Sequence, residues 1–191
     1  MKKKYHSVTA PETGLSPASA AGIQAVILPF LLLLAIYPVN SPAEWVVNPN
    51  VQNEAVGETI VAHNVNDDGY TLEVYKDTEA TIRVRFSLYD GLTGLDPDTC
   101  PTYQIDRGAP VNRSSNGERC RNSHNWAEYT FGRIQNNRIT SSALLAIMNG
   151  NDVLFRFQLE NGDYRETRIS LAGSKRSLTS VVGEEIVVRA Q

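Results

Sequence analysis

Apolar and polar residues alternate along two neighbouring stretches in the middle of the chain. In TIRVRFSL, residues 81–88, every second residue is apolar, with arginine or serine between them. YTLEVYK, residues 70–76, alternates in the same way. A period of two is the pattern of a strand that is buried on one face. We predict that the two stretches form a hairpin in which Lys76 faces Ala80 and Val74 faces Ile82, so that apolar residues share one face.

A second hairpin is expected in DVLFRFQLENGDYRETRISL, residues 152–171. A two-residue Asn-Gly turn would set phenylalanines opposite charged residues. A three-residue loop, Glu160–Gly162, with Gly162 in the left-handed conformation, shifts the register by one and sets Phe155 opposite Thr167. We predict the second register, because a one-residue slip moves every side chain to the other face of the sheet.

Two short helices complete the pattern. In ITSSALLAIMNG, residues 139–150, Thr140 or Ser141 is the expected N-cap and the final Asn-Gly ends the helix. In SKRSLTSVVG, residues 174–183, Ser174 is the expected N-cap and the final glycine is the stop. EEIVVRA, near the end of the chain, is either a last edge strand or a tail. The fold class is therefore mainly β: an antiparallel β-sandwich or open barrel with two short helices.

The N-terminus has the pattern of a secretory signal peptide. Three lysines follow Met1, and an apolar run of about fifteen residues, 23–37, comes later and is interrupted by Pro29. Crossing a membrane as a helix takes about 20 apolar residues. Ser41 and Ala43 are small residues at the positions that a signal peptidase reads. We expect cleavage after Ala43, which leaves 44–191 as a single exported domain in the periplasm or outside the cell. The alternative is a membrane anchor formed by an uncleaved N-terminal segment.

Cleavage changes the charge of the protein. Counted from Glu44, 15 Lys and Arg stand against 20 Asp and Glu, a formal net charge of −5. Nucleic-acid-binding proteins usually carry a basic balance, so we do not expect a nucleic-acid partner. Of the basic residues, 13 are arginines. Arginine forms forked pairs with carboxylates and stacks on aromatic rings, which suits both a β-sheet surface and an interaction face.

The chain has two cysteines, Cys100 and Cys120. They could be metal ligands, a redox pair, free thiols or a structural crosslink. A structural zinc site usually needs four ligands with close local spacing, and the exported part adds only His63 and His124. A C-x-x-C redox motif is absent from the sequence. Because disulfides persist in exported proteins, we predict a Cys100–Cys120 bond, which would contribute about 3 kcal/mol.

Three groups of residues match part of a catalytic or metal-binding pattern. NVNDDGY, residues 64–70, begins like a calcium loop, but its twelfth position is Tyr75 rather than glutamate, so a polar turn is expected. Asp96 and Asp98 are expected to cap a turn. His124 has no G-x-S-x-G nucleophile elbow to serve, and the sequence has no G-x-G-x-x-G, P-loop or H-E-x-x-H motif. We therefore expect no catalytic centre, metal site or cofactor.

Three stretches within residues 99–183 form a recognisable series: YQIDRGAP before a cysteine, SSALLAIMNGNDVLFRFQL and TRISLAGSKRSL. With them, the second half of the chain resembles the invasion-associated locus B family of bacterial periplasmic proteins. The two cysteines are farther apart here than is typical of the family. The resemblance implies an exported β-sandwich with no known catalytic centre in a family sometimes linked to host-cell entry. We take from it the compartment and the architecture.

These observations favour a protein that acts by binding another protein or an envelope component. The candidate contact residues are exposed arginine and aromatic side chains, which are enriched at interface hot spots: Tyr75, Arg83, Arg85, Arg156, Arg168, Trp126 and Tyr129. The alternatives are a small-ligand carrier with a barrel-type cavity and a small envelope hydrolase. A filled core would favour binding by the surface, a wide apolar cavity a carrier, and a deep pocket with convergent polar groups an enzyme.

Overall fold

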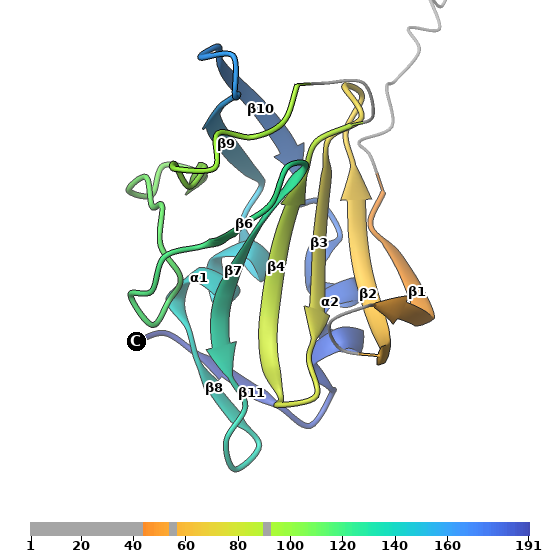
Figure 1. Ribbon diagram of the computed structural model, residues 1–191. Helices are drawn as coiled ribbons and strands as arrows, with labels where there is room; N and C mark the ends of the chain where they lie inside the picture. Colours follow the sequence, from red (N-terminus) through yellow and green to blue (C-terminus); the bar gives the residue numbers. More distant parts are fainter. Residues whose placement is uncertain (1–43, 54–56, 90–92) are drawn as a thin grey trace, which may run out of the picture. The chain divides into compact units, whose positions relative to one another are not determined.

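The computed structural model describes residues 44–53, 57–89 and 93–191. The expected signal peptide, 1–43, and its cleavage site after Ala43 lie outside the described residues. Within these ranges the chain forms the following strands and helices (Figure 1), in chain order: β1 Val46–Asn53, β2 Gly57–Val65, β3 Thr71–Lys76, β4 Thr81–Ser87, β5 Thr102–Ile105, β6 Arg121–Asn122, β7 Trp126–Arg133, β8 Arg138–Thr140, α1 Ser142–Asn149, β9 Asp152–Gln158, β10 Tyr164–Ser170, α2 Ser174–Val182 and β11 Val187–Arg189.

The described strands form two antiparallel sheets in a sandwich-like arrangement. The large sheet has the strand order β1-β2-β3-β4-β7-β6, and the small sheet has the order β10-β9-β5. A separate short pair, β8 and β11, is parallel. Both helices lie behind the large sheet in Figure 1, and α2 packs against β2 and β3. The expected mainly β fold with two short helices is confirmed, and the sandwich-like arrangement agrees with the first of the two expected architectures.

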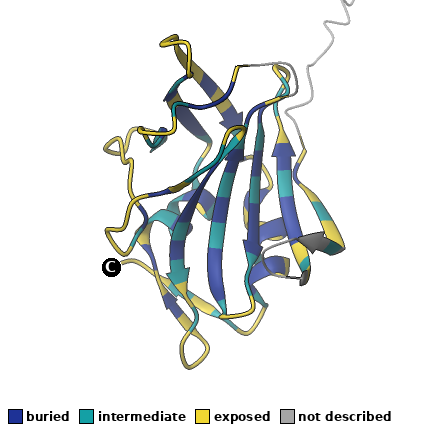
Figure 2. Cartoon of the chain, in the orientation of Figure 1, coloured by how far each residue is buried: buried dark blue, intermediate teal, exposed yellow. Residues whose placement is uncertain are grey.

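Aromatic side chains fill the space between the two sheets. Phe86 of β4 stacks on Phe155 of β9, with 4.3 Å between the ring centroids. The ring of Tyr103 in β5 meets that of Tyr129 in β7 edge-on, with 5.1 Å between centroids. Buried and partly exposed residues alternate along β4, as its sequence pattern predicts (Figure 2). Burying each large apolar side chain contributes about 1.5–3 kcal/mol, so this packed layer is the main stabilising feature of the sandwich.

The β9–β10 hairpin has the predicted register. Phe155 lies opposite Thr167, and Val153 lies opposite Ile169. Gly162 has a φ of +88°, the left-handed conformation expected of the third loop residue. The register predicted by matching the apolar faces of the two strands is therefore confirmed.

The β3–β4 hairpin is confirmed as a hairpin, but its predicted register is wrong by two residues. Lys76 faces Ile82 rather than Ala80, and Val74 faces Val84. The cause is the carboxylate of Asp77, which accepts hydrogen bonds from the backbone N–H of Glu79 at 2.9 Å and of Thr81 at 2.8 Å. These bonds stabilise a wider loop than the sequence suggests. A shift of two residues leaves every side chain on its predicted face.

The helix caps are half confirmed. Ser141 is the N-cap of α1, and its hydroxyl accepts a hydrogen bond from the N–H of Leu144 at 3.1 Å. Ser174 is not the cap of α2, because the left-handed Gly173 takes that position. The Ser174 hydroxyl instead donates to the carbonyl of Ile147 at 2.8 Å and so ties α2 to α1. EEIVVRA contains a strand, β11, in agreement with the first of the two expectations.

Side chains near the C-terminal end of β2 and just before β1 bind the edge of β10. Asn66, just after β2, donates to the carbonyl of Arg168 at 3.0 Å. Asn64 and Trp45 both donate to the carbonyl of Ser170, at 2.7 Å and 3.1 Å. These bonds join the large sheet to the edge strand of the small sheet.

The predicted disulfide is present between Cys100 and Cys120, which are 20 positions apart in the sequence. It closes the long loop that runs from Cys100 through β5 to β6. Cys120 is buried. Within this loop, Ser115 donates its backbone N–H to the carbonyl of Thr130 in β7 at 2.8 Å. The loop is thus fixed to the large sheet as well as closed on itself.

Candidate functional site

Polar residues cross the outward face of the large sheet in rows. In one row, His63, Glu73, Arg85 and Glu128 lie opposite one another on β2, β3, β4 and β7, and Arg121 of β6 lies opposite Glu128. The sign of the charge alternates from Glu73 to Arg121. Opposite charges on directly facing strand positions stabilise an antiparallel sheet, so this row stabilises the pairing of β3, β4, β7 and β6.

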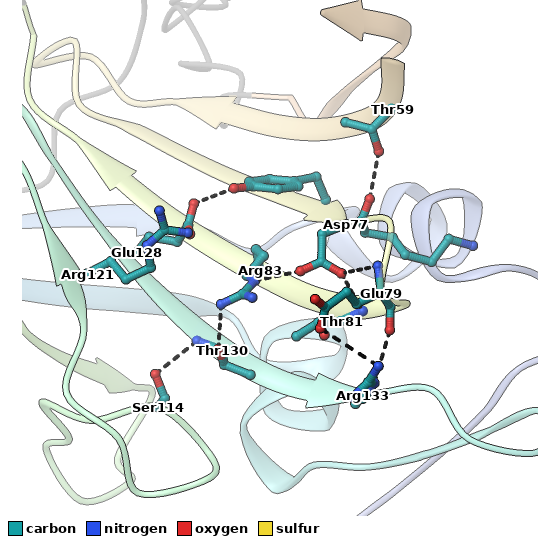
Figure 3. Close-up of polar contacts among 12 residues, drawn as sticks. Thr59, Asp77, Glu79, Thr81, Arg83, Ser114, Arg121, Glu128, Thr130 and Arg133 are labelled. Carbon is teal, nitrogen blue, oxygen red and sulfur yellow. Dashed lines mark hydrogen bonds and ion pairs between the residues drawn. The ribbon is translucent and has the colours of Figure 1, made fainter. Parts of the chain in front are cut away.

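Glu128 is the buried centre of this row, with its side chain 1% exposed. One carboxylate oxygen, Oε2, accepts hydrogen bonds from Arg85 Nη2 at 2.9 Å, from Arg85 Nε at 3.2 Å and from the hydroxyl of Tyr75. The other oxygen, Oε1, accepts from Arg121 Nη1 at 3.3 Å (Figure 3 labels Glu128 and Arg121). A buried carboxylate is stable only when paired and hydrogen-bonded in this way.

Arg85 lies between two aromatic rings. Its guanidinium carbon is 4.5 Å from the centroid of the Trp126 ring and 5.4 Å from that of the Tyr75 ring. Burial opposes the positive charge of Arg85, but Tyr75 and Glu128 outweigh it, so its pKa is raised above the ordinary value. Burial, followed by the hydrogen bond to Glu128, raises the pKa of Tyr75. At neutral pH Arg85 is therefore charged and Tyr75 is a neutral donor. We call Tyr75, Arg85, Arg121, Trp126 and Glu128 the outer-face cluster.

A second polar group lies next to this cluster, toward the β3–β4 turn (Figure 3). Arg83 binds Asp77 Oδ2 through Nε at 2.9 Å and donates from Nη1 to Thr130 Oγ1 at 2.8 Å. The hydroxyl of Ser114 accepts the backbone N–H of Thr130 at 3.0 Å. These bonds hold Arg83 in one position and anchor the disulfide-closed loop to β7.

The structure brings together four of the seven predicted contact residues and corrects two of the seven. Tyr75, Arg83, Arg85 and Trp126 lie on the outward face of the large sheet. Tyr75 was expected to be exposed, and this is wrong: it is 1% exposed, with its hydroxyl on Glu128.

Tyr129 was also expected to be exposed and is also 1% exposed. It lies opposite Val84, whose side chain faces the core, so Tyr129 points inward. Its hydroxyl donates to the carbonyl of Pro101. The ring of Tyr129 is therefore part of the core and cannot meet a partner.

Arg156 and Arg168 lie on the outward face of the small sheet, away from the cluster. Arg156 pairs with Glu166 at 3.3 Å, as the register predicts, and Arg168 pairs with Asp152. Both arginines are exposed. Exposed ion pairs of this kind contribute about 0–1 kcal/mol, so neither pair is strongly fixed.

Glu128 and Arg121 complete the cluster and were not among the contact residues predicted from the sequence. The alternation in WAEYTFG does place Trp126, Glu128 and Thr130 on one face. This alternation does not show that β7 pairs with β4, and that pairing sets Glu128 opposite Arg85. Arg121 belongs to a strand of two residues, too short for any periodic pattern to reveal.

The other candidate groups lie elsewhere. His124 is 66% exposed, and its Nδ1 is 3.0 Å from Glu160 Oε1. Asp96 caps a turn as predicted, accepting the N–H of Asp98 at 2.7 Å, and this bond is the main cause of its lowered pKa. Among the described residues, no three His, Cys, Asp or Glu side chains are grouped so that they could hold a metal ion. In the same ranges, no helix is both long enough and apolar enough to cross a membrane.

Comparisons of the chain with protein-family models, with curated proteins and with solved structures find no match. The function must therefore be argued from the residues of the site and from the sequence patterns.

Proposed function

We propose that this is an exported β-sandwich protein that binds another protein or an envelope component through the outward face of the large sheet. The observation that carries the proposal is the position of Arg85, held between the rings of Trp126 and Tyr75 above the buried Glu128. Arginine, tryptophan and tyrosine are the residue types most enriched at interface hot spots.

The cluster is fixed before any partner arrives. Four hydrogen bonds hold Glu128 in place, and two of them, together with the two ring contacts, orient Arg85. A side chain that is already ordered loses little conformational entropy on binding, which favours affinity. Arg121, 59% exposed at the edge of the cluster, supplies an accessible charge at its rim. This arrangement suits a partner that carries an acidic group beside an aromatic or aliphatic one.

The alternative of a carrier with a barrel-type cavity has less support. Such a carrier needs an open interior, and the described interior is occupied by stacked rings such as Phe86 on Phe155. The hydrolase alternative would need His124 next to a nucleophile, and the side-chain contact found for His124 is with Glu160. Binding by the surface is therefore the function that the geometry supports best.

Export and relationship to the invasion-associated locus B family are parts of the same proposal. The sequence pattern of 1–43 and the disulfide both support export, because disulfides persist in oxidising compartments. The test is intact-mass and N-terminal analysis of the protein isolated from its native host. We expect a chain that starts at Glu44 and contains no titratable thiol. An unprocessed chain with reduced cysteines would contradict export.

Double substitutions on each sheet test which face binds the partner. Domain 44–191 captures partners from native envelope extract, and quantitative mass spectrometry compares the wild type with two double variants. Arg121→Glu with Trp126→Ala alters the large sheet; Arg156→Glu with Arg168→Glu is the matched control on the small sheet. The purified partner is then titrated against each variant.

We expect at least tenfold weaker binding, about 1.4 kcal/mol, for the first double variant and little change for the second. Loss only in the control would move the binding face to the small sheet. Equal binding by all three proteins, with folding verified by circular dichroism, would reject both faces.

A further inference from the structure

A cavity of about 370 Å³ lies beside α1, and none of the five residues of the outer-face cluster lines it. One wall is formed by β5 and the loop that follows it, the other by α1, and Gln191 also lines the cavity. Tyr103, Ile105 and Val111 line the first wall, and Ala143 and Ala146 line the second.

The cavity exists because its helix wall carries small side chains. Ala143 and Ala146 are three positions apart in α1 and so lie on one face of the helix. Two alanines at these positions leave space that larger side chains would fill. The space is therefore specified by the sequence of α1.

Both walls are held in place. Tyr103 and Val111 exchange backbone hydrogen bonds, each 2.8 Å long, and the hydroxyl of Tyr103 donates to the carbonyl of Arg113 at 3.2 Å. The carboxylate of Asp106 accepts the N–H of Asn151, just beyond α1, at 2.9 Å. A preformed apolar cavity with few polar groups is the usual form of a small-molecule site, and such sites measure about 300–1,000 Å³.

The chemistry of the lining defines the ligand. Most of the lining is aliphatic or aromatic, and none of the described residues that line it is Asp, Glu, Lys, Arg or His. A charged group of a ligand would lose part of its hydration here and would find no charged side chain of opposite sign in the described lining. The polar side chains at the cavity are hydroxyls, such as those of Ser115 and Ser142, and the Gln191 amide.

We propose that this cavity is a binding site for an uncharged, mainly apolar small molecule with one hydroxyl or carbonyl group. At roughly 30 Å³ for each water-sized group, the volume holds about a dozen non-hydrogen atoms. The hydrogen-bonding group of the ligand would meet the serines at the rim. This site does not depend on the outer-face cluster, so either proposal can fail alone.

Naphthol, a two-ring phenol of about this size, is the probe. It is titrated into ¹⁵N-labelled domain 44–191, and amide shifts are followed by NMR. Naphthalene sulfonate is the charged comparison. We expect saturable shifts at Gly108, Ala143 and Ala146 with naphthol and at least tenfold weaker binding of the sulfonate.

Ala146→Leu fills the cavity without adding polarity, and Ala172→Leu, at an exposed position outside the cavity, is the matched control. We expect Ala146→Leu to weaken naphthol binding at least tenfold and Ala172→Leu to leave it unchanged. Should Ala146→Leu not fold, Ala143→Leu replaces it. The proposal is overturned if naphthol gives no saturable shift, if the shifts map elsewhere, if the sulfonate binds equally well, or if the filled variant binds as the wild type does.

Discussion

Glu128 is the residue on which the outer-face cluster depends. It is buried, it lies between two arginines, and it accepts the hydroxyl of Tyr75. Removing one member of a buried pair costs more than the pair contributes, because the remaining charge keeps its desolvation cost without its partner. Here the remaining charge would be that of Arg85, which is only partly exposed.

The variant Glu128→Gln keeps the size of the side chain and removes its charge. We expect it to lower the free energy of unfolding by about 2 kcal/mol, less than for a fully buried pair because Arg85 keeps some contact with solvent. Urea unfolding followed by tryptophan fluorescence measures the change. Glu79→Gln is the matched control, since Glu79 is 69% exposed and pairs with Arg133 at 3.7 Å. Equal effects of the two changes would show that the buried hydrogen bonds of Glu128 contribute no more to stability than an exposed ion pair does.

Tyr103 gives a prediction about alkaline stability. Burial raises the pKa of Tyr103 from 10.0 to about 12 in the folded protein. The folded state therefore holds this proton more tightly than the unfolded state. Its contribution to stability is complete below pH 10 and is lost as the pH rises through about 12. Two pKa units correspond to about 3 kcal/mol.

We expect the free energy of unfolding to fall between pH 10 and pH 12, and to fall less steeply in Tyr103→Phe. Urea titrations at each pH measure the slope. Tyr164→Phe, at an exposed side chain, is the matched control. The same slope in Tyr103→Phe as in the wild type would refute the prediction.

At the residue scale, sequence alternation assigned faces better than it assigned exposure. It placed Tyr75 on the outward face correctly. The side chain of Tyr75 is nevertheless buried there, with its hydroxyl on Glu128. For Tyr129, the local alternation sets the side chain on the face opposite to that of Trp126 and Glu128. The pairing with Val84 shows that this face is the core, which an expectation of exposure for Tyr129 overlooked.

At the element scale, the turns decided which predictions held. The β9–β10 loop contains a glycine that accepts a left-handed conformation, a strong local signal, and its register is confirmed. The β3–β4 loop depends on Asp77, whose side chain bonds two backbone N–H groups. The sequence does not show whether such a side chain faces solvent or closes a loop. The predicted register of the β3–β4 hairpin was wrong by two residues for this reason.

Gly162 tests the contribution of the β9–β10 turn. An added Cβ would meet no atom within 4 Å, so the cost of Gly162→Ala comes from its φ of +88° alone. We expect a loss of about 1 kcal/mol, measured as a lower urea midpoint with an unchanged slope. Gly162→Asn is the comparison and should lose less, because asparagine tolerates this conformation. If both variants match the wild type, the turn conformation does not limit stability.

At the scale of the whole molecule, the sequence predicted the class of fold and the disulfide but not which faces meet. Sheet order depends on contacts between residues far apart in the chain, such as Phe86 with Phe155. The same holds for the outer-face cluster, since Arg85 and Glu128 are 43 positions apart. The alternating arginines of β4 could be predicted from the local sequence, but their pairing with β7 could not.

The disulfide gives a prediction for the whole molecule. Replacing both cysteines, Cys100→Ser with Cys120→Ser, frees a loop whose ends are 20 positions apart. We expect the free energy of unfolding to fall by about 3 kcal/mol, because the open loop gains entropy in the unfolded state. Urea unfolding of the variant and of the reduced wild type should agree. An unchanged midpoint in both would show that contacts such as Ser115 with Thr130 alone define the loop.

The side chains bound along β10 have a consequence for solubility. An open strand edge invites another chain to add a strand, which is a common first step toward fibres. Here Asn66, Asn64 and Trp45 occupy the carbonyls of Arg168 and Ser170. The bonds that hold the two sheets together thus also leave fewer free carbonyls on β10 to which a strand of another chain could pair.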